Sequence, residues 1–329
     1  MLEFIYMKNL VNVLETFYEK KVLVIGDVML DKYTFGNVQR ISPEAPVPVI
    51  MVEREEYKPG GAGNVALNVA NLSPKGEVYL FGFIGKDDNG YKLERILEER
   101  GIKCYFEENN QTIMKERVIG RSYGQQQHIV RIDREENSPK KFSSIEEILK
   151  IAEKVDKIII SDYAKGAITK ELMGSLNSYK GKMIIDPRPT NKDFNEIYKN
   201  AFLITPNKNE AFKMSGVYDV DNAGEKLRKK FDSNILITLG KDGMKLFTIN
   251  NEKVEIKTIP EESFEETGAG DTAIATVALA LCSLDNSLES LINAAKLGNY
   301  AAGITVKNIG TYAPTLDELR NKLLSLIQK

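Results

Sequence analysis

Short runs of β-branched and other apolar residues alternate along the chain with stretches of helical periodicity. Apolar runs of about four to eight residues are typical of strands buried on both faces. The clearest runs are Val22–Gly26, Val78–Gly85, Ile158–Ser161, Met183–Asp186, Phe202–Thr205 and Ile235–Gly240. Helical spacing is found at Asn64–Leu72, Tyr91–Arg100, Ile145–Val155, Asp271–Ser283 and Ser287–Val306. This alternation predicts an α/β fold in which helices cover both faces of a mainly parallel sheet.

Two segments interrupt the alternation, at about residues 32–58 and 103–134. Their β-prone runs are Tyr33–Phe35, Val47–Val52, Thr112–Gly120 and His128–Ile132. We expect them to pair as one small sheet inserted into a single domain of residues 1–329. Because they flank a glycine-rich element, the sheet would act as a lid over a substrate. A structural flap or a dimer contact is the alternative, and one sheet could serve both roles.

Composition narrows the classes of function. The 329 residues carry a net charge of −2, which gives no electrostatic footprint for nucleic acid. The single histidine, His128, excludes zinc sites that need two, and we expect it on a strand without a catalytic role. Cys104 and Cys282 are interpreted as free thiols. The N-terminus does not resemble a cleavable leader, and Thr272–Leu284 is too short to span a bilayer, so we expect a cytoplasmic protein without membrane contact.

The sharpest chemical signal is the segment E-T-G-A-G-D-T at Glu266–Thr272, directly before an apolar helix. Gly268, Ala269 and Gly270 would let backbone N–H groups converge, and a helix N-terminus favours an anion there. Asp271 in the first turn would lie beside that anion as a candidate base. Its alternative role is a plain helix cap, which would not need G-A-G before it.

Two segments fit the pattern G-x-G-x-x-A, at Gly61–Ala66 and Gly268–Ala273. A dinucleotide-binding fold places such glycines immediately after an apolar strand. Polar residues precede both segments, and no G-x-x-x-x-G-K-[ST] occurs in the chain. The sequence therefore disfavours a dinucleotide fold and excludes a P-loop.

A second glycine-rich element contains Gly60 and Gly61 and ends at Asn64. Asp27 and Asp31 follow the first buried strand, at the end where open α/β sheets bind ligands. Carboxylates and an amide offer the acceptors and donors that sugar hydroxyls need. For Asn64 alone, an N-cap is the alternative interpretation.

Two further elements follow strands of the predicted core. Asn207, Lys208, Asn209 and Glu210 come after the fifth run, where an acid and an amide can position Mg²⁺, through Glu210, and a phosphate. A capping arrangement is the alternative. The last core strand is followed by a glycine turn that would cradle nucleotide phosphates or simply form a hairpin, at Thr238, Gly240 and Gly243.

These elements, G-G-A-G-N, N-x-x-E, T-x-G-x-x-G and T-G-A-G-D in that order, resemble the ribokinase-like (PfkB) family of sugar kinases across essentially the whole chain. The resemblance implies a three-layer core with a β lid, ATP with Mg²⁺, and phosphoryl transfer to a sugar hydroxyl. It makes Asp271 the base and Gly268–Asp271 the anion hole. It places nucleotide contacts at Asn207–Glu210 and at the glycine turn Thr238–Gly243. It also implies a homodimer through the lid and adenine contacts near Asn293–Gly303, and it leaves open a monovalent cation. Glu265 stands where the family usually has aspartate.

Within that family, three segments are similar to D-glycero-β-D-manno-heptose 7-phosphate kinases: Gly26–Asp31, Arg40–Val49 and Ser161–Gly166. The string R-I-S-P-E-A-P-V-P-V in the second is the most specific. This resemblance implies phosphorylation of the anomeric hydroxyl to the 1,7-bisphosphate, for ADP-heptose biosynthesis. Many such kinases are fused to a nucleotidyltransferase, and this chain resembles the kinase part alone.

A phosphorylated sugar needs cations, and the chain supplies only local ones. We expect Lys165, Arg117 and Arg121 to meet the phosphate, with Lys115, Arg131 and Arg188 as further candidates. A solvated strand edge is the alternative for each arginine. The functional alternatives are another PfkB-type kinase (for ribose, fructose, fructose 6-phosphate or a keto-deoxy sugar), a non-catalytic sugar- or nucleotide-binding regulator, and a dehydrogenase.

Overall fold

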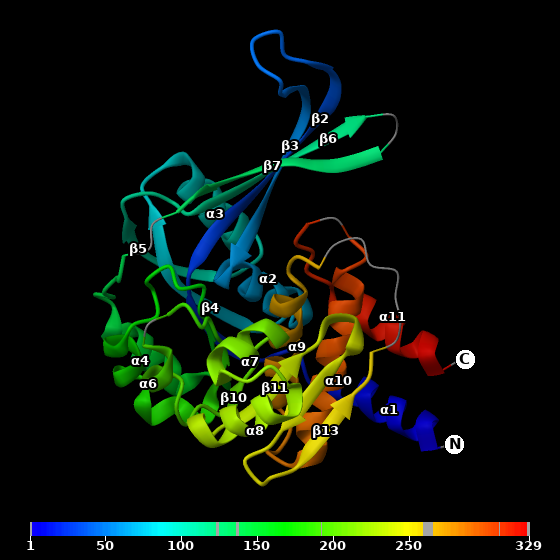
Figure 1. Ribbon diagram of the computed structural model, residues 1–329. Helices are drawn as coiled ribbons and strands as arrows, with labels where there is room; N and C mark the ends of the chain where they lie inside the picture. The colour runs from blue at the N-terminus through cyan, green and yellow to red at the C-terminus, as the bar shows by residue number, and fades with distance from the viewer. Residues whose placement is uncertain are drawn as a thin grey trace.

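The computed structural model describes residues 2–122, 125–135, 138–191, 193–258, 266–308 and 310–327. Within these ranges, nine strands form the central sheet in the order β13-β12-β11-β10-β9-β8-β1-β4-β5 (Figure 1). Neighbours from β5 to β11 are parallel, while β12 and β13 continue the sheet antiparallel. The strands are β1 Lys21–Gly26, β4 Glu77–Gly85, β5 Lys103–Asn109, β8 Lys157–Ser161, β9 Met183–Asp186, β10 Leu203–Ile204, β11 Asn234–Thr238, β12 Met244–Phe247 and β13 Lys253–Ile256.

Alternate residues of the central strands point into two hydrophobic cores, one on each face of the sheet. Val22 and Val24 of β1 belong to one core, and Leu23 and Ile25 belong to the other. Side chains alternate between the faces of a strand, so a strand buried on both sides is apolar throughout. The α/β fold with a mainly parallel sheet, predicted from these runs, is confirmed.

Helices cover both faces. The first core is closed by α1 Leu2–Glu15, α2 Ala62–Leu72, α3 Asp88–Glu98, α9 Ala269–Leu281, α10 Leu288–Thr305 and α11 Leu316–Ile327. The second is closed by α4 Ile145–Lys154, α5 Lys170–Ser175, α6 Phe194–Ile197, α7 Lys208–Ser215 and α8 Val220–Phe231. Two 3₁₀ helices, η1 Asn177–Lys182 and η2 Gly240–Asp242, complete the helical elements of the described residues. None of these helices combines the length and the apolar character that a membrane crossing would need.

A second, four-stranded sheet stands on the carboxyl side of this core, in the order β3-β2-β6-β7 (Figure 1). It consists of β2 Val28–Ile41, β3 Pro48–Gly61, β6 Met114–Ser122 and β7 Gln125–Arg134. β2 pairs antiparallel with β3 and parallel with β6, and β7 closes the sheet antiparallel to β6. The predicted small inserted sheet is therefore present, and we refer to it as the lid. His128 lies exposed on its edge strand β7.

The lid differs from the predicted segments at both limits. β2 and β3 extend beyond residues 32–58, down to the core at Val28 and Gly61. In the range 103–134, Lys103–Asn109 forms β5, which pairs with β4 at the edge of the central sheet. Only the part from Met114 onward belongs to the lid. At the open edge of a sheet β5 needs no continuous apolar run, so its mixed sequence resembled an inserted ribbon.

Candidate active site

The N-terminus of α9 has the conformation expected of a glycine-rich helix start. Gly268 is the N-cap, with a left-handed φ of 82° that glycine adopts without strain. A Cβ at this position would lie 3.0 Å from Asn64 Nδ2, whereas a Cβ at Gly270 would have no neighbour within 4 Å. The N–H of Ala269 donates to the carbonyl of Glu266 (3.2 Å), so an anion here would be met by the N–H groups further along the first turn.

Asp271 lies in this first turn and is 5% exposed. Asn64 Nδ2 donates to its Oδ2 at 2.7 Å, and the Tyr163 hydroxyl donates to its Oδ1 at 2.8 Å. Burial raises the pKa of Asp271 to about 6, against the lowering effect of both hydrogen bonds. The carboxyl group is thus ionised at neutral pH, with a proton affinity well suited to a general base.

Asn64 contacts Asp271 from inside α2, which begins at Ala62, so its role as an N-cap is excluded. Asn68, one turn on, donates to the Asn64 carbonyl at 2.8 Å and accepts from the Thr272 hydroxyl at 2.8 Å. This buried ladder joins α2 to α9. Asn68 also donates a long hydrogen bond to Asn64 Oδ1 at 3.4 Å, which helps to fix the amide that contacts Asp271.

Asp27 also lies buried in this region, where it accepts three hydrogen bonds from backbone N–H groups. Its Oδ2 accepts the N–H groups of Tyr163 (2.8 Å) and Lys165 (3.0 Å), and its Oδ1 accepts that of Ala167 (3.0 Å). Burial raises the pKa of Asp27, although the three N–H groups oppose this. The side chain predicted to bind sugar therefore fixes the loop after β8.

Asp31 forms a buried ion pair with Arg117, with 2.7 Å between Oδ1 and Nη1. Burial raises the pKa of Asp31, and the guanidinium opposes the rise. Gly60 passes so close that a Cβ there would lie 2.5 Å from Asp31 Oδ2. Gly61 has a φ of 56°, and a Cβ there would lie 2.4 Å from the Asp27 carbonyl oxygen. Both glycines are thus needed where the lid meets the core.

Two other arginines of the lid pair with carboxylates of the lid itself. Arg121 is exposed and pairs with Glu53 at 3.2 Å, far along the lid from the strand ends. Arg131 donates two hydrogen bonds to Asp133, at 2.6 and 2.7 Å. Arg121, predicted at the substrate phosphate, is thus not brought to the other candidate residues.

Lys165 and Lys115 come together at one carboxylate. Each ammonium group lies 2.5 Å from a different oxygen of Glu135. Lys165 follows β8 in the core, while Lys115 lies on β6 of the lid. The contact therefore joins the lid to the core.

A cavity of about 740 Å³, counting space open to solvent, lies beside Asp271. The N-terminus of α9 and the carboxyl ends of β8, β9 and β11 surround it. Of the residues proposed for nucleotide and anion binding, six line it: Asn207, Glu210, Thr238, Gly268, Gly270 and Asp271. Lys208 and Asn209 are exposed on the first turn of α7 and are not among its lining residues.

The Asn207–Glu210 element caps α7 and also faces this cavity. Asn207 Oδ1 accepts the Glu210 N–H, and Glu210 Oε2 accepts the Asn207 N–H, both at 2.9 Å. This reciprocal arrangement is a capping box. The other carboxylate oxygen of Glu210 accepts from Arg188 Nη1 at 3.2 Å. Capping and ligand binding are therefore compatible here.

The two glycines of the predicted phosphate cradle lie in the turn between β11 and β12. Gly240 and Gly243 have φ values of 61° and 91°. A Cβ at Gly243 would lie 2.1 Å from the Ile256 carbonyl oxygen, so the turn alone requires glycine there. Neither is among the residues lining the cavity. Their nucleotide contacts remain a prediction.

Residues 19–318 match the family model described as pfkB family carbohydrate kinase. The chain belongs to this family. A relative, the bifunctional protein HldE of a Nitratiruptor species, is 39% identical over 311 residues, covering 91% of this chain and 64% of the relative. The chain spans less than two thirds of the length of the curated relatives that it matches. The predicted family is confirmed.

Solved structures of the family share the fold of this pfkB kinase. Phosphofructokinase-2 of Escherichia coli in complex with potassium superposes with a TM-score of 0.74 at 17% identity, covering 94% of this chain and all of the other. Ribokinase of Arabidopsis thaliana complexed with ribose and ATP gives 0.70 at 20% identity, covering 95% and 99%. At these identities the likeness establishes a ribokinase-like fold.

Three site residues of this pfkB kinase carried no predicted role. Tyr163 donates to Asp271, and Asp162 beside it accepts from the Tyr198 hydroxyl at 2.5 Å. Burial raises the pKa of Asp162 to about 6. Asp186 lines the cavity, and burial and the charges of Glu210 and Asp271 raise its pKa well above the ordinary value. Asp162 and Tyr163 lie in the Ser161–Gly166 segment that carried the family resemblance, whereas the only sequence signal of Asp186 was its place at the carboxyl end of a strand.

The donor set of this pfkB kinase fits a magnesium ion only in part. Among the described residues, no group of three or more histidine, cysteine or acidic side chains is arranged to enclose a metal. Asp186 and Glu210 nevertheless both line the cavity, and their mutual repulsion contributes to the raised pKa of Asp186. Mg²⁺ is commonly held by one or two carboxylates together with phosphates and water. These two side chains therefore suit a nucleotide-bound Mg²⁺.

Three further expectations concern the cysteines, Glu265 and the adenine contacts. Cys104 and Cys282 are free thiols, as predicted. Glu265, noted as a departure from the family pattern, lies outside the described residues. Adenine contacts near Asn293–Gly303 stay a prediction.

Proposed function

We propose that this pfkB kinase uses ATP to phosphorylate the anomeric hydroxyl of D-glycero-β-D-manno-heptose 7-phosphate, giving the 1,7-bisphosphate. The observation that carries the proposal is Asp271, an ionised carboxylate beside an open helix N-terminus and a cavity. The heptose assignment rests on the three sequence segments similar to heptose 7-phosphate kinases. The 39% identity to a bifunctional protein HldE supports a close relationship.

In the proposed reaction, the oxygen of the C1 hydroxyl forms a bond to the γ-phosphorus. Asp271 accepts the proton of that hydroxyl in the same step. The bond from that phosphorus to the β–γ bridging oxygen breaks, and ADP leaves. The N-terminus of α9 stabilises the negative charge carried by the transferring group. Asn64 and Tyr163 keep the carboxylate aimed at the hydroxyl.

The nucleotide would occupy the cavity between α9 and the ends of β9 and β11. Ribokinase crystallised with ATP has the same fold, which supports ATP as the donor. Glu210 and Asp186 would hold Mg²⁺, which supplies charge neutralisation to the phosphates when bound. The potassium complex of phosphofructokinase-2 motivates a test for a monovalent cation, with activity measured in potassium against sodium salts.

We also propose that two copies of this chain associate through the lid. Ile41, Met51, Val52 and Val130 are 47 to 64% exposed on it. Large apolar side chains exposed on one sheet are candidates for an interaction surface. Analytical ultracentrifugation should detect a dimer that Met51→Asp dissociates, and a monomeric wild type would contradict this.

The experiment that tests the reaction is coupled ADP release with ATP and Mg²⁺. Heptose 7-phosphate is offered beside ribose, fructose, fructose 6-phosphate and a keto-deoxy sugar. Strong preference for heptose 7-phosphate supports the proposal. Turnover of another sugar would discard the heptose assignment, and absence of turnover with every sugar would favour a binding protein.

A further inference from the structure

Lys115, Glu135 and Lys165 form a compact ion cluster at the base of the lid. Both ammonium groups lie 2.5 Å from Glu135, one on each oxygen. The three side chains are only 15, 21 and 16% exposed. Burial raises the pKa of Glu135, but the two lysines outweigh it and hold the pKa below the ordinary value. Glu135 is therefore an anion held by two cations.

This cluster differs in charge from the neighbouring pairs. Arg117 faces Asp31, and Arg131 donates two hydrogen bonds to Asp133. In the cluster, two ammonium groups share Glu135, with Asp133 3.6 Å from Lys115 as the next carboxylate. In the cluster, one cation from the lid and one from the core therefore share the Glu135 carboxylate.

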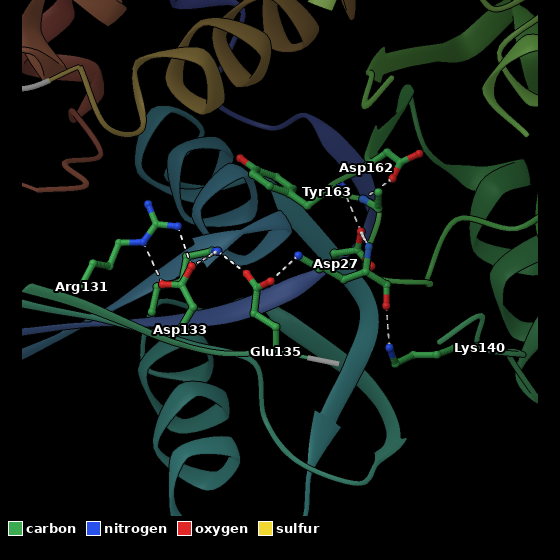
Figure 2. Close-up of polar contacts among 10 residues, drawn as sticks. Asp27, Arg131, Asp133, Glu135, Lys140, Asp162 and Tyr163 are labelled. Atoms are coloured by element: carbon green, nitrogen blue, oxygen red, sulfur yellow. Dashed lines mark hydrogen bonds and ion pairs between the residues drawn. The ribbon is translucent and has the colours of Figure 1, made fainter. Parts of the chain in front are cut away.

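The cluster is also connected to the candidate base. The Lys165 N–H donates to the same Asp27 oxygen as the Tyr163 N–H, and the Tyr163 hydroxyl donates to Asp271. Figure 2 shows Glu135 between Asp133 on the lid side and Asp27 with Tyr163 on the core side. Lys165 therefore lies on the loop that carries Tyr163 to Asp271, and Lys115 reaches the same carboxylate from β6.

We propose that Lys115 and Lys165 bind the phosphate group that the sugar substrate already carries, and that Glu135 is an internal anion which this phosphate displaces. The inference rests on the proposed function, because it requires a phosphorylated sugar. A phosphate monoester has oxygens enough for both ammonium groups and carries more charge than a carboxylate. It would therefore compete with Glu135 for the two lysines.

Displacement of Glu135 makes the two kinds of substitution act in opposite directions. Lys115→Gln and Lys165→Gln each remove a charged donor, and should weaken sugar phosphate binding by about ten- to a hundredfold. Glu135→Gln removes the competing anion, and should strengthen binding by about two- to fivefold. If Glu135 only tied the lid to the core, its loss would weaken binding as well.

The chain contains a matched control at the opposite ends of the strands. Lys21 and Lys103 both contact Glu77, at 2.7 and 2.5 Å. This second cluster is more exposed, with 48, 48 and 33% of the side chains accessible. Lys103→Gln and Glu77→Gln make the same charge changes away from the site. They should leave sugar phosphate binding unchanged.

The test is isothermal titration calorimetry of the whole chain, without nucleotide, against heptose 7-phosphate and dephosphorylated heptose. Fructose 6-phosphate and fructose form a second pair. We expect the wild type to prefer the phosphorylated sugar, the lysine variants to lose that preference, and Glu135→Gln to increase it. Circular dichroism spectra of all variants establish that they are folded.

The possible results separate this inference from the heptose assignment. If fructose 6-phosphate alone is preferred over its unphosphorylated form, and this preference depends on the two lysines, the phosphate subsite is kept and heptose is discarded as the sugar. Lysine variants that keep the full preference, a weakened Glu135→Gln variant, or a wild type that binds no phosphorylated sugar in preference to its unphosphorylated form would each overturn the subsite.

Discussion

Asp27 and Asp271 are both buried carboxylates at the carboxyl edge of the central sheet, 3 and 5% exposed. Asp27 accepts three backbone N–H groups of one loop. Asp271 accepts one hydrogen bond from the side-chain amide of Asn64 and one from the hydroxyl of Tyr163, and it lines the cavity. Burial alone therefore does not distinguish these two carboxylates, whereas the kind of donor and the access to the cavity do.

The two carboxylates are linked through Tyr163. Asp27 fixes the backbone of Tyr163, and the Tyr163 hydroxyl reaches Asp271. Loss of Asp27 should be expressed mainly as loss of stability. Loss of Asp271 should be expressed as loss of turnover.

The largest effect is expected from Asp271→Asn. An amide cannot accept the substrate proton, so kcat should fall by about 10²–10⁴-fold in the ADP-release assay. The melting temperature should change little, because a buried charge is removed and the Tyr163 hydroxyl, unlike a backbone N–H, can turn to accept from the new amide. Asp317→Asn, at an exposed surface ion pair, is the control. Turnover close to that of the wild type would remove Asp271 from the reaction.

Asp27→Asn should act on stability. The amide presents a donor where the carboxylate accepted N–H groups, so at least one buried N–H loses its acceptor. We expect the free energy of unfolding to fall by about 1–3 kcal/mol, measured by urea denaturation. An unchanged urea midpoint with strongly reduced sugar affinity would instead favour direct substrate binding by Asp27.

The pH dependence of turnover should report Asp271. Its pKa is raised to about 6, and only the ionised form can accept a proton. Activity is therefore present above about pH 6 and should fall about tenfold per pH unit below it. The measurement is kcat/KM between pH 5 and 8, at constant ionic strength. A profile that stays flat down to pH 5 would contradict the raised pKa.

Tyr163→Phe should give the smallest change in turnover. It also tests whether Asp271 causes the fall of activity at low pH, the acid limb of the profile. Tyr163 is a positioning residue whose hydroxyl lowers the pKa of Asp271, so its loss should move the limb to higher pH. At pH 8, where Asp271 stays ionised, kcat should fall by less than about tenfold. Tyr179→Phe, on η1, is the control. A limb that does not move would assign it to another group.

Six strands of the central sheet, β1, β4, β8, β9, β10 and β11, could be predicted because they are largely buried on both faces and are therefore continuously apolar. β5 could not, because Lys103–Asn109 lies at a sheet edge where polar residues are tolerated. Asp271 and Asn64 could be singled out from their glycine-rich surroundings. Tyr163 could not, because its contact with Asp271 joins residues 108 positions apart.

Arg117 and Arg121 show the same limit on one strand. Four positions apart on β6, they point in the same direction in a regular strand and looked equally suited to bind phosphate. The structure places Arg117 in a buried pair with Asp31 and Arg121 at an exposed pair with Glu53. Where a strand leaves the core depends on packing between distant segments, which one sequence does not reveal.

The uninterrupted β2 has a mechanical consequence. Its fourteen residues form a rod of about 45 Å, from Val28 beside the core to Ile41, which is 62% exposed. Asp31 lies near the inner end, and the pairing with β3 shifts register between Phe35 and Gly36. One continuous strand thus ties the exposed tip of the lid to the buried Asp31, so a contact made at the tip is joined to the position of Asp31 by a single run of backbone.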